Sequence, residues 1–212
     1  MSSISRLGAV SGILACVGGF VVETYAASNY PGYSPISQSI SRLGSLESPL
    51  YYLITGWSVV FTILITVFAY GFYTAFRNEF HRVKLASFLI FIYGLGEGLV
   101  AGIFPMDTTV IDRIDLFDPH NIASGIGVAS LVLFPFVVEP LFRGKDRKGA
   151  MYTLLVAVFG LLFFLLFLLA KFDYYPILVP FKGLWQRLFQ VIYYSYFMFI
   201  AIRMIKVRPA KN

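Results

Sequence analysis

Residues 150–170 read AMYTLLVAVFGLLFFLLFLLA and contain no charged side chain. A helix of about 20 apolar residues spans the hydrocarbon core of a bilayer, which is roughly 30 Å thick. The composition of the whole chain is similar in character: 58% of its 212 residues are hydrophobic and 13% are charged. A soluble domain carries about 25% charged residues. The composition therefore excludes a soluble globule, a disordered chain and a disulfide-rich module, and it predicts a polytopic membrane protein.

Five further apolar runs have a similar length. We expect one all-α domain over residues 1–212 that crosses the bilayer six times, with spans at about 7–27, 50–76, 85–104, 121–142, 150–170 and 183–205. The sixth run is short between Arg187 and Arg203, whose long side chains can reach the interface. The lone cysteine, Cys16, excludes a disulfide within the chain.

The basic residues predict the orientation. Of the 17 lysines and arginines, twelve fall on the side of the two termini and five on the opposite side. Loops rich in lysine and arginine stay in the cytoplasm, so we expect both termini there and the protein in the cell membrane. Because these charges lie in short segments between apolar runs, the net charge of +6 does not indicate nucleic-acid binding. Two long segments, 28–49 and 105–120, then face outward.

Small residues on two of the spans predict close helix packing. Gly94, Gly98 and Gly102 are spaced four apart, and so are Gly8 and Gly12. Helices in lipid associate through such faces, since the absence of side chains lets the backbones approach each other.

Glu97 lies beside the glycine face of the third span, about 10 Å below its outer end. An ionised side chain in mid-membrane is costly, so it needs a partner, a proton or a water pocket. Two interpretations stay open: a protonated or arginine-paired glutamate, and a group that binds ligand or handles protons.

Other polar residues share this depth. The set comprises Glu23, Arg42, Glu97, Asp107, His120, Gln186 and Arg187. We expect Arg42 and Arg187 to be countercharges for Glu23, Glu97 or Asp107. The cluster would be either an ionic lock or a pocket for a lipid headgroup or small polar molecule.

Motifs for catalysis or cofactor binding are not found. His81 and His120 are predicted on opposite sides of the membrane, so they cannot share a metal. Asp112, Asp115 and Asp118 favour a solvated acidic loop over a metal site. Ser124, within Ala-Ser-Gly, lacks a histidine on a later helix to act as its base. We expect no metal and no cofactor.

Four elements carry a family resemblance: residues 36–44 (ISQSISRLG), residues 102–107 (GIFPMD), His120, and residues 183–187 (GLWQR). Together they resemble the domain of unknown function 998 (DUF998) family of prokaryotic six-helix membrane proteins, over nearly the whole chain. A fainter similarity runs to the Frag1/DRAM/Sfk1 membrane proteins. The family resemblance implies an architecture but no reaction. It also implies that certain residues belong together, namely Ser39, Ser41, Arg42, Asp107, His120 and Arg187.

Three functional hypotheses follow. The first is a non-enzymatic protein, either an accessory or assembly subunit with a membrane-protein partner or a module that binds an outer-leaflet lipid headgroup or small molecule at the polar cluster. The second is a proton-coupled transporter that uses Glu97. The third is a membrane-embedded hydrolase or transferase with Asp107 and His120 as acid and base.

Overall fold

The computed structural model describes residues 3–105 and 118–206, and in these residues the long elements are all helices. Six helical segments are long and apolar enough to cross a membrane, which confirms the all-α, six-span prediction. The spans are α1 (Ser3–Ser28), α2 (Tyr51–Phe76), the segment Val83–Ile103, α5 (Pro119–Phe142), α6 (Arg147–Lys171) and α7 (Lys182–Lys206). Two short 3₁₀ helices, η1 (Ile40–Gly44) and η3 (Val179–Phe181), lie between them.

The segment Val83–Ile103 is not a uniform α-helix. It consists of α3 (Val83–Tyr93), a π-helical segment η2 (Gly94–Val100) and the single turn α4 (Ala101–Ile103). π-helical turns are rare, and they frequently occur at functional sites. A single helix was expected at about 85–104, and the change of winding occurs where glycines are dense.

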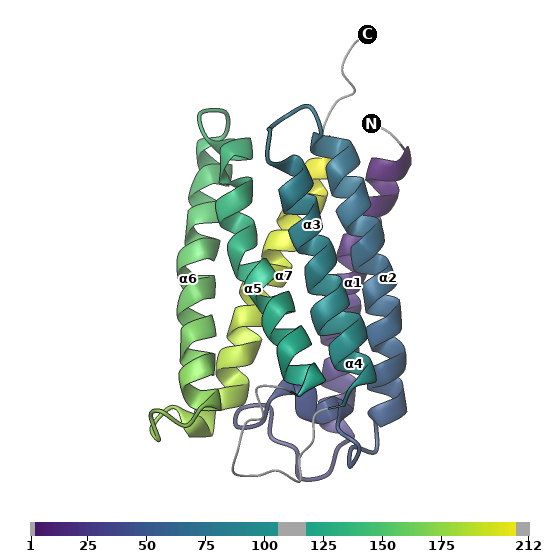
Figure 1. The fold of residues 1–212 in the computed structure, drawn as a ribbon, viewed down its shortest axis with the longest axis vertical. Helices are drawn as coiled ribbons and strands as arrows, with labels where there is room; N and C mark the ends of the chain where they lie inside the picture. Colours follow the sequence, from purple (N-terminus) through teal and green to yellow (C-terminus); the bar gives the residue numbers. More distant parts are fainter. Residues whose placement is uncertain (1–2, 106–117, 207–212) are drawn as a thin grey trace.

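The six spans form a closed ring. In chain order, α1 packs on α2, α2 on α3, α3 on α5, α5 on α6 and α6 on α7, and α7 returns to α1. The ribbon shows the helices side by side, with both chain ends at one end of the bundle and the long segment after α1 at the other (Figure 1). We call these the terminal half and the cavity half.

Glycines set the closest contacts in this ring. A Cβ atom on Gly8 would lie 2.6 Å from the Cα atom of Gly71, so α1 and α2 cross backbone to backbone. On the third span, the predicted face of Gly94, Gly98 and Gly102 meets α2. Gly96 points the other way, toward the backbone of α5. The π-helical segment is therefore held tightly between two helices.

Aromatic rings fill the terminal half. Phe68, Phe72, Phe134 and Phe197 have no solvent exposure. Phe197 contacts the rings of Phe68 and Phe134 at centroid distances of 5.3 and 5.5 Å, mostly edge to face, which is the favoured geometry for aromatic pairs. This layer closes the interior of the ring toward the termini.

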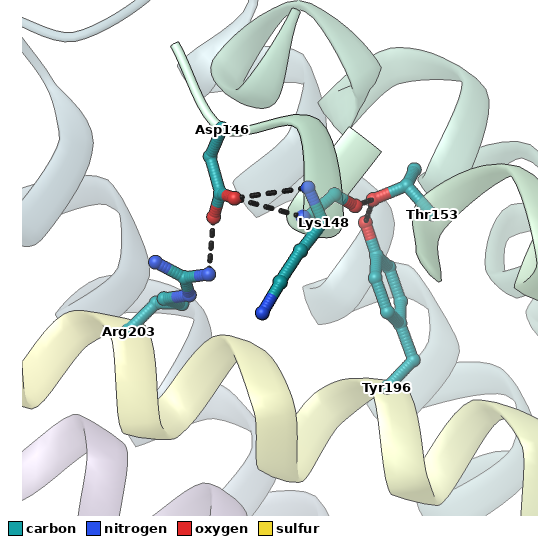
Figure 2. A network of polar contacts seen from close by, with 6 residues as sticks. Asp146, Lys148, Thr153, Tyr196 and Arg203 are labelled. Atoms are coloured by element: carbon teal, nitrogen blue, oxygen red, sulfur yellow. Dashed lines mark hydrogen bonds and ion pairs between the residues drawn. The ribbon is translucent and has the colours of Figure 1, made fainter. Parts of the chain in front are cut away.

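A polar network ties α6 to α7 at the terminal end (Figure 2). Asp146 caps α6 by accepting hydrogen bonds from the backbone N–H groups of Lys148 and Gly149, both at 3.1 Å, and it forms an ion pair with Arg203. The backbone hydrogen bond from Gly149, together with the charge of Arg203, lowers the pKa of Asp146. One turn deeper, the hydroxyl groups of Thr153 and Tyr196 lie 2.9 Å apart.

Candidate functional site

The segment between α1 and α2 folds over the cavity half as a roof, and Arg187 of α7 holds it there. One guanidinium nitrogen donates to the carbonyl oxygens of Pro35, at 2.7 Å, and Gln38, at 3.2 Å. The other donates to the hydroxyl of Tyr33 at 2.6 Å. Hydrogen bonds from a charged donor are stronger than neutral ones, so Arg187 fixes the conformation of this segment.

The neighbours of Arg187 complete the attachment. The side-chain oxygen of Gln186 accepts from the backbone N–H of Ile40 at 2.8 Å, and the N–H of Leu184 donates to the carbonyl of Ile36 at 2.8 Å. A Cβ atom on Gly183 would collide with the carbonyl oxygens of Pro35 and Gln38. The sequence GLWQR at 183–187 thus forms the surface of α7 on which the roof packs.

A cavity of about 150 Å³ lies under this roof. All six spans and η1 contribute to its lining. An engineered cavity of similar volume in another protein admits benzene, so this one has room for a small organic group. The polar side chains that line it are Glu23, Ser41, Ser58, Glu97, His120, Ser124, Lys171, Gln186 and Gln190, and the aromatic ones are Trp57, Phe61, Tyr93, Phe164, Phe167, Phe189 and Tyr194.

Glu97 projects into the cavity from the π-helical segment. Its carboxyl group is within hydrogen-bonding range of the Ser124 side chain and in the electrostatic field of His120 and Lys171. Its second oxygen, Oε2, is buried and receives no hydrogen bond from the described residues. Buried polar atoms almost always have a partner, so this oxygen marks a position that a ligand or a water molecule would satisfy.

His120 has one ring nitrogen already committed. Its Nδ1 lies 2.9 Å from the carbonyl oxygens of both Ala101 and Phe104. Carbonyl oxygens only accept hydrogen bonds, so Nδ1 must carry a hydrogen. Asp118 positions the residue by accepting its backbone N–H at 3.0 Å as the N-cap of α5. His120 therefore joins the end of the third span to α5, and only Nε2 is left to face the cavity.

A second hollow of about 380 Å³ lies on the other side of Glu23. Residues of α1 and α7 line it, with Pro35 of the roof above. Glu23 and Gln190 line both hollows, and the Gln190 side chain donates to Glu23 Oε1 at 2.7 Å. This hydrogen-bonded pair therefore lies where the two spaces adjoin, and we call it the partition.

The structure brings together most of the predicted polar set. Glu23, Ser41, Glu97, His120 and Gln186 line one cavity. The remaining residues lie around it: Ser39 is buried in the roof, where its carbonyl accepts a hydrogen bond from Tyr33, Arg42 is part of η1, Arg187 lines the second hollow, and Asp107 lies outside the described residues.

Among the described residues, the structure shows no direct ion pair of Arg187 with Glu23 or Glu97, although the charge of Arg187 acts on Glu23 and both residues line the second hollow. Arg187 bonds to backbone carbonyls and Tyr33, and Glu23 bonds to Gln190, a neutral amide. Within residues 3–105 and 118–206, the ion pairs are Arg143–Glu139, Lys145–Glu79 and Arg203–Asp146, all in the terminal half. The carbonyl groups of the roof lie within hydrogen-bonding distance of Arg187. They accept the hydrogen bonds of its guanidinium group, so no buried carboxylate is needed.

Three residues that line the cavity were not in the predicted polar set: Lys171, Gln190 and Ser124. Lys171 ends α6, and its Nζ donates to the side chain of Asn121 at 3.0 Å. Helical spacing carries a signal for the other two, because residues four apart share a helix face: Gln190 follows Gln186, and Ser124 follows His120, by four positions.

The described residues contain no group of three or more His, Cys, Asp or Glu side chains that could hold a metal ion. Of the acidic run, Asp112 and Asp115 lie outside these residues, and Asp118 is the N-cap of α5. Asp107 also lies outside the described residues, so its use with His120 as acid and base stays a prediction.

A ring of six apolar helices around a polar cavity defines a multi-pass membrane protein. The family model described as "Protein of unknown function (DUF998)" matches residues 13–203, and the chain belongs to this family. No curated protein and no solved structure matches the chain significantly. The comparisons do not extend the relationship to the Frag1/DRAM/Sfk1 proteins.

Proposed function

We propose that this protein is a binding protein of the cell membrane, and that its ligand is a lipid headgroup or a small polar molecule held in the cavity. The observation that carries the proposal is Glu97 Oε2, a buried acceptor without a partner among the described residues, which faces a space of about 150 Å³. The excess of lysine and arginine beside the termini supports cytoplasmic termini and a cavity in the outer half of the membrane.

Packing favours binding over transport. A proton-coupled transporter that uses Glu97 needs a path from the cavity to the opposite side of the membrane. The cavity floor is formed by Phe61, Tyr93 and Tyr194, and Tyr93 contacts the ring of Phe197 at 5.9 Å. The fully buried rings of the terminal half lie beyond. A site that is closed toward the termini suits a receptor or carrier of a ligand better than a permease.

Native mass spectrometry tests the proposal. We expect the protein released from membranes to carry a non-covalent adduct. Ser124→Leu places a larger side chain in the cavity and should remove the adduct. Gly125→Leu is the matched control, since a Cβ at Gly125 meets no atom within 4 Å and this variant should keep the adduct.

Thermal melts of both variants establish that they are folded. If wild type carries no adduct, or if a folded Ser124→Leu retains it, the cavity is not the binding site. The prediction of an accessory or assembly subunit is separate, and copurification of another membrane protein would support it.

A further inference from the structure

The second hollow lies between the cavity and the side of the bundle. Phe20, Thr24 and Ala27 of α1 line one wall, and Val191 of α7 lines the other. Thr24 and Val191 are exposed on the surface of the bundle, where the acyl chains of a bilayer would lie. A molecule that reaches the cavity from the membrane by this route meets Glu23 and Gln190 first.

The partition between the two spaces consists of side chains. Glu23 and Gln190 face each other from α1 and α7 through one hydrogen bond of 2.7 Å. Both side chains have several rotatable bonds, so a change of rotamer joins the two spaces without moving a helix. A ligand can pass most easily if it donates its own hydrogen bond to Glu23 in place of the one from Gln190.

The described lining of the cavity carries more carboxyl groups than ammonium groups. Among the described lining residues there are two carboxyl groups, Glu23 and Glu97, and one ammonium group, Lys171. Lys171 already donates to Asn121, and Nδ1 of His120 already donates to backbone carbonyls. An ammonium group on the ligand would donate to Glu97 Oε2 and add the positive charge that the lining lacks.

The walls suit the same group. Trp57, Phe61 and Phe164 line the same cavity as these carboxyl groups. Aromatic faces attract cations, and this attraction is strongest where water is excluded. A cavity that combines aromatic walls with carboxyl groups suits an organic amine.

Building on the proposed function, we propose that the ligand is a single-chain amphiphile with a protonated amine head. Its ammonium group occupies the cavity between Glu23 and Glu97, and its hydrocarbon chain lies in the hollow between α1 and α7. The opened Glu23–Gln190 contact is the passage between them.

Tryptophan fluorescence provides the test, because Trp57 lines the cavity and the chain has only two tryptophans. Trp185→Phe leaves Trp57 as the single reporter in the purified protein, held in neutral maltoside micelles. The probes are octylamine, octanol and ethylamine at pH 7. We expect octylamine to bind with a dissociation constant at least about tenfold below that of octanol, and Glu97→Gln to weaken octylamine by about tenfold.

The passage is tested by filling the hollow. Thr24→Phe should weaken octylamine by about tenfold and leave ethylamine within about twofold. Val21→Phe is the control, since Val21 is an exposed residue of the same helix outside the lining of either hollow. It should change neither affinity.

The outcomes separate this inference from the proposed function. Equal binding of octanol and octylamine overturns the amine head, and an unchanged octylamine affinity in folded Thr24→Phe overturns the lateral passage. If no probe binds while the mass-spectrometric adduct persists in wild type and Gly125→Leu, this inference is wrong and the proposed function stands. If the adduct is absent as well, both are wrong.

Discussion

The two halves of the bundle satisfy their carboxylate side chains in opposite ways. In the terminal half, Asp146 receives two backbone hydrogen bonds and an ion pair, and aromatic rings fill the space beneath. In the cavity half, Glu97 lies beside an open space with an oxygen unpartnered among the described residues. The same six helices are thus solid at one end and hollow at the other.

We interpret this difference as a division of roles, in which the terminal half supplies stability and the cavity half supplies binding. A packed aromatic layer can hold the ring closed, which allows the other half to keep a space that contributes nothing to packing. Strained or incompletely satisfied groups persist only where the surroundings enforce them, and they are commonly part of a functional site. Variants that affect only one half test whether this division is real.

Removing a ring from each half should give the largest contrast. Phe197→Ala leaves a void in the solid half. Because the unfolded helices remain in lipid, packing is the main term lost, and we expect about 3 kcal/mol. Phe164→Ala only enlarges an existing space and should cost about 1 kcal/mol or less. Unfolding in mixed micelles, followed by circular dichroism, measures both. Equal losses would contradict the contrast between the halves.

The wall of the cavity depends on a glycine contact. Gly96→Ala adds a Cβ that collides with the carbonyl oxygen of Ala123 and lies 3.0 Å from the Cα of Gly127. Backbone atoms cannot rotate away, so we expect a loss of about 2 kcal/mol and a weaker adduct. Gly125→Ala meets no atom within 4 Å and should be neutral or stabilise the helix by about 0.5 kcal/mol. A harmless Gly96→Ala would show that η2 and α5 are not in close contact.

The roof depends on Arg187. Arg187→Ala removes the hydrogen bonds to Tyr33, Pro35 and Gln38. This region is partly exposed, so we expect a loss of about 1–2 kcal/mol together with faster proteolysis of residues 29–39. Arg187→Lys keeps the charge but not the two-directional geometry and should recover only part. Arg147→Ala, at an exposed position of α6, is the control and should leave proteolysis unchanged.

Loss of the Asp146 carboxylate should have the smallest effect on stability, and this effect should depend on pH. The folded-state pKa of Asp146 is lowered, so its contribution is present above its unfolded pKa of about 4 and disappears as the pH falls through the folded value. At pH 7 we expect wild type to exceed Asp146→Asn in stability by about 0.5–1 kcal/mol.

Once the pH falls below the lowered folded-state pKa of Asp146, the two proteins should converge, because both then lack the charge. Unfolding curves of the two proteins across this range give the difference. A stability difference that does not change with pH would show that the Asp146 charge has no role in holding α6 to α7.

Much of the architecture follows from local sequence. The uncharged run at 150–170 and its five counterparts specify the spans, since hydrocarbon excludes charge wherever the chain crosses it. The glycines of the third span specify close packing for the same kind of reason: a missing side chain permits backbone approach whatever the neighbour is. These properties belong to a residue and its near neighbours, so they can be predicted without knowing which helices meet.

The tertiary structure decided which polar groups meet. Glu23 lies on the first span and Gln190 on the last, and they touch because α7 closes the ring against α1. Arg187 was expected to pair with a carboxylate, but it holds the carbonyl groups of the roof, because the path of residues 33–38 brings them within reach. Lys171 reaches the cavity because α6 packs on α5, where its Nζ donates to Asn121. Charge and polarity identify side chains that need partners, and only the order of helices around the ring determines which partners lie within hydrogen-bonding distance.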